Sequence, residues 1–206
     1  MICRKRKLIF VHIPKCGGTS LENEIWPDEA QRTPENLWMG FTRPMHNAYQ
    51  TGGLQHLTAR LVRQVVGEQM FADCFKFAIV RHPLNRLVSQ FKYMEQRADL
   101  REFAGLPPRF DFSTYLDHIL RTPHVQWTPQ NEFLLDADGR LLVNKTYRLE
   151  ELNSNFEQFR RDIGLDIVLR HDNKTAHVAA PEISPRDKAR VLEFYSADYD
   201  LLGYER

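Results

Sequence analysis

The sequence predicts an α/β domain built on a mainly parallel central sheet flanked by helices. Two apolar runs rich in β-branched and aromatic residues, 8–13 and 75–80, have the length of buried parallel strands. Each run leads into a charged turn and then into a stretch whose apolar residues recur at helical spacing. Because ligands of such sheets bind beyond the carboxyl ends of the strands, we expect two ligand-binding turns at one edge.

Length and composition narrow the class of protein. The 206 residues suffice for one domain, which we assign to 1–206, and hydrophobic residues make up 42% of them. A formal net charge of +1 gives no global basic field, so we expect no nucleic-acid partner. The three cysteines lack paired spacing, and no apolar run approaches the ~20 residues of a membrane span. We therefore expect a cytoplasmic protein without a membrane span.

The first turn combines the features of an anion-binding loop. Pro14 ends the first strand, because proline cannot donate to a sheet ladder. Two adjacent glycines then allow a tight turn, and the helix behind them would offer unpaired N–H groups to a phosphate or sulfate. We expect Thr19 or Ser20 to cap that helix. The candidate anion-binding residues are Lys15, Cys16, Gly17, Gly18, Thr19 and Ser20.

The order of lysine and glycine separates this loop from the common nucleotide-binding loop. In the P-loop of nucleoside triphosphatases the lysine follows the last glycine, whereas Lys15 precedes the glycine pair. An ordinary nucleoside triphosphatase is therefore disfavoured. The alternative without a ligand is a plain Gly-Gly turn that carries a surface lysine.

The second turn pairs a guanidinium group with a hydroxyl group. Arg81 directly follows the apolar run 75–80, and Pro83 suits the first turn of a new helix. Ser89 would lie about two turns into that helix, with Arg86 roughly on the same face. Arginine can bind two phosphate oxygens at once, so the pattern suits a second phosphate group. The alternative is an arginine-rich, solvated start of a helix.

The other elements follow from periodicity and turn residues. Asp138-Gly139 predicts the turn of a hairpin. Residues 27–53 and 96–108 are irregular and long enough to be substrate loops. The expected elements are helices over 54–70, 112–120 (capped by Asp111 or Ser113), 149–163 and 185–196, a hairpin over 133–144, and a last strand over 166–169.

Together the two turns resemble the donor-binding motifs of sulfotransferases that use 3′-phosphoadenosine 5′-phosphosulfate (PAPS). Residues 13–20, Ile-Pro-Lys-Cys-Gly-Gly-Thr-Ser, resemble the 5′-phosphosulfate loop of that family. Residues 80–89 match the pattern V-R-x-P-x-x-R-x-x-S of its 3′-phosphate site in full. The form Pro-Lys-Cys-Gly-Gly-Thr-Ser is similar to the carbohydrate (family 2-like) branch. Weaker agreement continues at 127–130, 147–152, 173–175 and 199–204, so the resemblance spans most of the chain.

The resemblance implies a fold and a reaction. The fold would be the P-loop-like sulfotransferase variant of the α/β class. The reaction would move a sulfuryl group from PAPS to a hydroxyl acceptor, a carbohydrate or a glycosylated small molecule, by in-line displacement without a metal. Residues Lys15 to Ser20 would hold the 5′-phosphosulfate, and Arg81 and Ser89 would meet the 3′-phosphate. Sulfuryl transfer, like phosphoryl transfer, builds negative charge on the leaving oxygen in the transition state, and Lys15 would neutralise that charge.

The acceptor hydroxyl needs a general base, and a neutral histidine suits pH 7. We favour His56, because related carbohydrate sulfotransferases carry a histidine thought to act as base between the two donor motifs. Glu22 and Glu24 are the carboxylate alternatives, although a charged outer face of the first helix accounts for them better. His46 and His124 are expected to line the acceptor pocket.

Two other classes of function stay open. A non-catalytic nucleotide-binding module would keep Arg81, Ser89 and the glycine loop but lack a working base, and Lys15 favours catalysis over it. A P-loop-type kinase would need a hydroxyl residue on magnesium after a Walker lysine. The acceptor's identity and the oligomeric state are not readable from the sequence.

Overall fold

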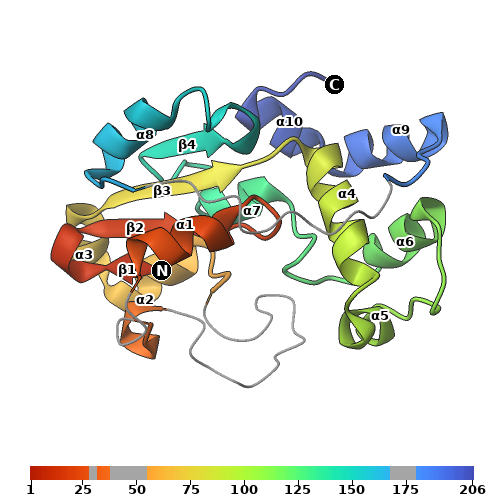
Figure 1. The fold of residues 1–206 in the computed structure, drawn as a ribbon, viewed down its shortest axis with the longest axis horizontal. Coiled ribbons are helices and arrows are strands. Elements are labelled where there is room, and N and C mark those ends of the chain that lie inside the picture. Colours follow the sequence, from red (N-terminus) through yellow and green to blue (C-terminus); the bar gives the residue numbers. More distant parts are fainter. Residues whose placement is uncertain (28–31, 38–54, 168–179) are drawn as a thin grey trace.

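The fold is built on a four-stranded sheet in the order β1-β2-β3-β4 (Figure 1). The computed structural model describes residues 1–27, 32–37, 55–167 and 180–206. β1 runs antiparallel to β2, whereas β2, β3 and β4 are parallel. The predicted α/β class with a mainly parallel sheet is confirmed. The strands are β1 (Ile2–Cys3), β2 (Leu8–Val11), β3 (Phe75–Val80) and β4 (Lys145–Arg148).

The register of the sheet brings the two predicted turns together. Val11 of β2 lies opposite Ala78 of β3. Pro14 and Arg81 each stand three residues beyond this pair, so the loop after β2 and the turn after β3 leave the sheet side by side. β4 completes the edge, with Arg148 opposite Val80.

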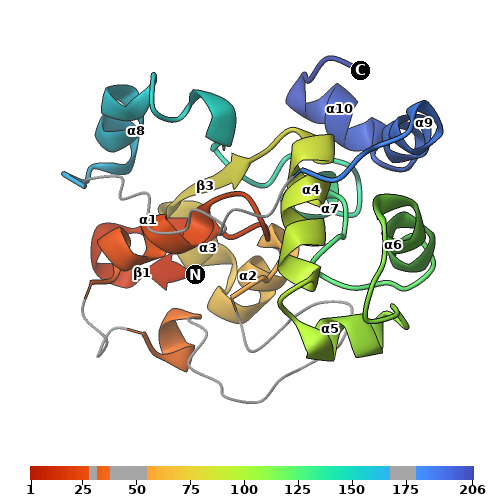
Figure 2. The same ribbon diagram turned by 45° about the vertical axis from the view of Figure 1, so that its right-hand side comes forward.

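The helices surround the sheet and extend past its carboxyl edge. Figure 1 shows α8 on one side of the sheet, α2 and α3 on the other, and α4, α5, α6 and α9 beyond the strand tips; Figure 2 gives the same grouping from another angle. The helices are α1 (Gly18–Ile25), α2 (Ala59–Val66), α3 (Glu68–Asp73), α4 (Pro83–Met94), α5 (Ala98–Phe103), α6 (Phe112–Ile119), α7 (Gln130–Leu134), α8 (Phe156–Ile163), α9 (Pro185–Phe194) and α10 (Ser196–Leu202).

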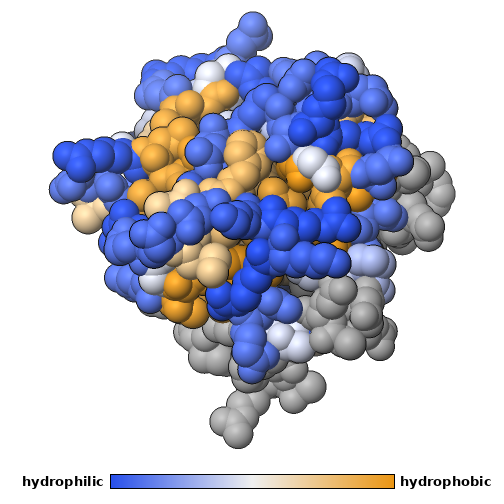
Figure 3. Space-filling model, turned by 90° about the vertical axis from the view of Figure 1, so that its left-hand side faces the viewer, coloured by the Kyte–Doolittle hydropathy of each residue, from blue (hydrophilic) through white to orange (hydrophobic). Residues whose placement is uncertain are grey.

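The buried apolar residues form two clusters. One surrounds the sheet and includes Phe10, Phe77 and Phe159. The other joins the helices beyond the strand tips and includes Phe91 and Tyr115. The carboxyl edge of the sheet, where the two turns lie, faces the second cluster. The opposite end of the molecule shows hydrophobic residues between hydrophilic ones (Figure 3), as is normal for a globular surface.

Several local predictions need correction. The helix expected over 54–70 is two helices, because Gly67 takes a positive φ of 83° and ends α2. Residues 96–108 contain helix α5. The hairpin expected over 133–144 is confirmed in a shorter form: α7 ends at Leu134, and an antiparallel bridge joins Leu135 to Leu141 around Gly139, whose φ is 77°.

In the last third of the chain, the observed elements also differ in their bounds from the predicted ones. Only 156–163 of the helix expected over 149–163 is α-helical, after a 3₁₀ turn at Leu149–Glu151. Asp166 and Ile167 are not in a strand, and the rest of that predicted strand lies outside the described residues. The helix from Pro185 ends at Phe194, and α10 follows it. Asp111 caps α6 as predicted, since its Oδ1 accepts from Thr114 N at 2.8 Å.

In the described parts of the chain, no helix is long and apolar enough to cross a membrane.

Candidate functional site

The loop after β2 presents an uncapped helix start. Gly17 is the N-cap of α1, with φ 78°, and no side chain accepts a hydrogen bond there. The prediction that Thr19 or Ser20 caps this helix is therefore wrong, since both lie within its first turn. The N–H groups of that turn are left to a ligand or water. An 8-residue helix behind them adds the positive end of its dipole.

Both glycines of the loop are required by their surroundings. A Cβ on Gly18 would come within 2.4 Å of the His12 ring, so the ring packs directly against the backbone. A Cβ on Gly17 would come within 2.8 Å of Leu149, and its φ is in the left-handed region. Lys15 also adopts a positive φ, of 66°, which is uncommon for a residue with a side chain. The packing of His12 and Leu149 against these two glycines thus fixes the tight course of the loop.

Cys16 serves the loop through packing. Its side chain is buried, and its Sγ lies 3.4 Å from Gln130 Oε1. Burial raises the pKa of the thiol to about 12. The side chain is therefore a neutral anchor, and only its backbone N–H is available for ligand binding.

Lys15 stands among cations over an aromatic ring. Its Nζ lies 4.0 Å from the centre of the Tyr93 ring on α4. Burial, followed by the positive charges of Arg81 and Arg97, lowers the pKa of Lys15 to about 8. Cations gathered in this way favour an anionic ligand, because the ligand would relieve their repulsion.

Arg81 is held by its backbone and reaches toward the loop with its side chain. Gln130 Oε1 accepts from Arg81 N at 2.9 Å, and Gln130 Nε2 donates to Arg81 O at 2.7 Å. The guanidinium group donates from Nη1 to the carbonyl of Lys15 at 3.2 Å. Asp198 supports Gln130 in turn, since its Oδ2 accepts from Gln130 N at 2.8 Å.

Arg86 is buried on α4. It is 1% exposed, so the alternative of a solvated, arginine-rich helix start is wrong for this residue. Its guanidinium group donates to the carbonyls of Pro14 at 3.0 Å, Thr128 at 2.8 Å and Gln126 at 3.3 Å. Arg86 therefore ties the anion-binding loop to the segment before α7. Ser89 itself is half-buried on α4, one turn before Tyr93.

Residues near the C-terminus brace the start of α4. Glu150 accepts from His82 N at 2.9 Å through Oε1 and from the Tyr204 hydroxyl at 3.1 Å through Oε2. Arg148 donates to Leu202 O at 2.7 Å and pairs with Glu151. The sequence matches at 147–152 and 199–204 thus meet in space.

His56 is buried behind the loop in a defined tautomer. Its Nδ1 lies 3.1 Å from the carbonyl oxygen of His12. A carbonyl only accepts, so Nδ1 carries the proton and Nε2 keeps its lone pair. Burial lowers the pKa of His56 well below its usual value of 6.5, with nearby His12 adding to the effect. The ring is therefore neutral at pH 7.

Glu22 is part of the same buried cluster. It is 1% exposed, so the expectation that it belongs to a charged outer face is wrong. Gln55 Nε2 donates to both of its oxygens, at 3.0 and 2.8 Å. His12 Nδ1 lies 2.5 Å from Glu22 Oε1, and the two rings His12 and His56 meet edge to face at 4.6 Å. Glu24 is half-buried on the same helix.

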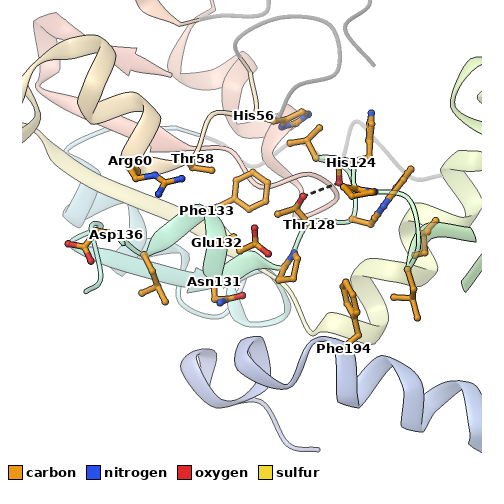
Figure 4. A pocket seen from close by; sticks show the side chains of 17 residues that line it. His56, Thr58, Arg60, His124, Thr128, Asn131, Glu132, Phe133, Asp136 and Phe194 are labelled. Carbon is orange, nitrogen blue, oxygen red and sulfur yellow. Dashed lines mark hydrogen bonds between the residues drawn. The ribbon is translucent and has the colours of Figure 1, made fainter. Parts of the chain in front are cut away.

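A cavity of about 620 Å³ adjoins His56 (Figure 4). His124 also lines it, with Nδ1 accepting from Gln126 N at 3.2 Å, so the proton of His124 is on Nε2. His56 borders this cavity, whereas none of the candidate donor-binding residues in the described segments lines it. The wall is formed by parts of 56–60, 119–129 and 131–136 and by Phe194. His46 lies outside the described residues.

Sequence reasoning missed three residues of the site. Gln130, Gln55 and Tyr93 act on Arg81, Glu22 and Lys15 respectively. A weak signal existed only for Gln130, which ends the match at 127–130. Within the described residues, no group of three or more His, Cys, Asp or Glu side chains is placed to hold a metal ion.

Comparison with known proteins agrees with these motifs. The model of the Sulfotransferase family matches residues 1–205. Carbohydrate sulfotransferase 10 of Pongo abelii is 23% identical over 256 aligned residues, and that of Danio rerio is 23% identical over 252. Each match covers 100% of this chain and 66% of the relative, so the chain spans about two thirds of their length. No solved structure matches this chain.

Proposed function

Because the chain belongs to the sulfotransferase family, we propose that it transfers a sulfuryl group from PAPS to a hydroxyl acceptor. One juxtaposition carries the proposal. The uncapped start of α1 lies at the same sheet edge as Lys15 and Arg81, and a neutral histidine with a free lone-pair position, His56, packs against His12 behind the loop. The reaction needs a polyanionic donor and a proton acceptor, and these residues are suited to both roles.

The donor fits the residues of the two turns. Backbone N–H groups from Gly17 to Ser20, and Lys15, are suited to the 5′-phosphosulfate. Arg81 and Ser89 would take the 3′-phosphate. The fixed backbone of Arg81 supports this role, because Gln130 occupies both of its main-chain groups and leaves the guanidinium to act. Cys16 would contribute its N–H alone.

The reaction requires a base and a charge stabiliser. The acceptor oxygen would attack sulfur while the bond from sulfur to the leaving phosphate oxygen breaks. His56 Nε2 would take the hydroxyl proton, and Lys15 would neutralise the leaving oxygen. The other candidate bases are less suited. Glu22 is bound to Gln55, and His124 carries its proton on Nε2.

The acceptor class follows from the relatives and is part of the proposal. The two relatives named above are carbohydrate sulfotransferases, which supports a carbohydrate or glycosylated acceptor. We also retain the proposal of a cytoplasmic location, supported by the free thiols of Cys3, Cys16 and Cys74. A reaction without a metal remains a prediction, tested by activity in the presence of a chelator.

Calorimetric titration with 3′-phosphoadenosine 5′-phosphate (PAP) tests the donor site. We expect micromolar binding by the wild type and a loss of at least about a hundredfold in Arg81→Ala, the effect of removing a charged partner from a phosphate. Arg161→Ala is the matched control, because Arg161 is exposed on α8, away from the strand tips (Figure 1). Absence of PAP binding by folded wild type would refute the proposal.

Activity separates the catalytic proposal from its alternatives. Transfer of labelled sulfate from PAPS that is lost in Lys15→Ala and His56→Ala supports an enzyme. PAP binding without transfer to any hydroxyl compound would favour the non-catalytic module. The kinase alternative has lost its basis, because the family model spans both turns.

A further inference from the structure

The cavity beside His56 has two chemically different ends. Figure 4 shows Arg60 and Asp136 toward one end and Phe194 toward the other, with His56 along the rim between them in this view. A ligand that spans this cavity would meet charged side chains at one end and a hydrocarbon surface at the other. The cavity volume of about 620 Å³ suits a molecule larger than a single sugar.

The apolar end is exposed to solvent in a way that a ligand would relieve. Phe194 is 42% exposed although its ring is large and apolar. Ile119, Leu120 and Pro123 join it on the cavity wall. Apolar surface gathered in a concave site gains free energy when a complementary apolar group covers it.

His56 connects this cavity with the chemistry. A general base must lie within hydrogen-bond reach of the acceptor hydroxyl. His56 borders the cavity, and its Nδ1 lies 3.1 Å from the carbonyl oxygen of His12, in the segment that leads into the donor loop. A hydroxyl group bound beside His56 would have the Nε2 lone pair as its proton acceptor.

We propose that this cavity is the acceptor site and that the acceptor is amphipathic. Its polar, hydroxyl-bearing part lies between Arg60 and His56, and an aryl or alkyl substituent packs on Phe194. This inference rests on the proposed function, and it adds that an apolar group beside the hydroxyl is what the site selects.

The test compares two glycosides by calorimetry on the full chain. The probes are 4-nitrophenyl β-D-glucopyranoside and methyl β-D-glucopyranoside, which share the sugar and differ in the apolar group. We expect the nitrophenyl compound to bind at least about tenfold more tightly, the effect of burying an aromatic ring. Phe194→Asp should abolish that advantage.

Leu201→Asp is the matched control, because Leu201 is 41% exposed on the adjacent helix α10 and does not line the cavity. It should leave the tenfold difference intact. The inference is overturned if the two glycosides bind equally, if neither binds, or if both variants weaken binding alike. PAP titration of the same variants separates the two proposals. PAP binding without a nitrophenyl preference refutes the acceptor site alone, and the reverse result refutes the donor site alone.

Discussion

The turns after β2 and β3 use their backbones in opposite ways. In the loop after β2 the helix start is uncapped, so the main-chain N–H groups of its first turn have no side-chain acceptor. In the turn after β3 the main-chain N–H groups already have partners, since Arg81 N donates to Gln130 and His82 N donates to Glu150. The first turn therefore offers backbone N–H groups and one lysine, and the second offers a side chain on a backbone that is held by hydrogen bonds. Two turns of such different chemistry could each recognise a different phosphate group of one ligand.

The largest expected effect comes from the buried arginine on α4 that ties the loop after β2 to the segment before α7. Arg86→Leu leaves three buried carbonyls without their donor, and we expect a loss of about 3–5 kcal/mol in the free energy of unfolding. Denaturation in urea measures it. Arg206→Leu, which breaks an exposed pair with Asp200, should cost less than about 0.5 kcal/mol. Equal losses in both variants would mean that Arg86 does not hold that loop and that segment together.

The buried cluster behind the first turn should affect rate more than donor binding. Glu22→Gln replaces the carboxylate that accepts twice from Gln55, the residue next to His56. We expect kcat to fall about a hundredfold through misplacement of the base, with the Kd for PAP unchanged. Glu22 would then be a positioning residue. Steady-state kinetics and PAP titration provide the two measurements.

A swapped pair is the control for this prediction. The double variant Glu22→Gln and Gln55→Glu restores an amide–carboxylate pair with the roles exchanged, and we expect it to recover most of the lost kcat. A double variant no better than Glu22→Gln would assign the defect to the lost charge beside His12. In the wild type, the acid limb of kcat/KM should lie below pH 6.5, because burial lowers the pKa of His56.

The same comparison explains which parts of the site were predictable from sequence. Lys15, the glycine pair and Arg81 were found because each follows its own strand within a few residues. Gln130 lies 49 residues from Arg81, and Gln55 lies 33 from Glu22, so no local pattern links them. The burial of Arg86 was not predicted for a related reason. Helical spacing gives the angular position of a side chain, but not whether carbonyls from another segment cover it.

Local capping was also misjudged for a physical reason. Thr19 and Ser20 are good capping residues, yet the left-handed Gly17 begins the helix earlier and places both inside it. The α/β class and the sheet edge were confirmed, because they depend on the two apolar runs. The breaks at Gly67 and after Glu151 were not anticipated, because apolar spacing continues across them.

Titration of Lys15 sharpens the contrast between the two turns. With its pKa at about 8, Lys15 is charged below pH 8 and loses its charge above it, whereas arginine keeps its charge. PAP affinity should therefore fall as pH rises through 8, by up to about tenfold per unit while the bound form stays protonated. Calorimetry at pH 7, 8 and 9 measures the slope. Lys15→Arg should remove it, and a slope that survives in this variant would assign the titration to another group.

The smallest expected effect concerns the ring beneath Lys15. The Nζ of Lys15 lies over Tyr93, so a donor must draw the lysine away from a cation–π contact worth about 0.5–1 kcal/mol. Tyr93→Leu removes this competitor, and PAP should bind about two- to fivefold more tightly. Tyr93→Phe keeps the ring and should change affinity less than about twofold. Weaker binding in Tyr93→Leu would show that the ring holds Lys15 in its binding position. Both turns would then present a side chain fixed in advance, and the contrast between them would be confined to their backbones.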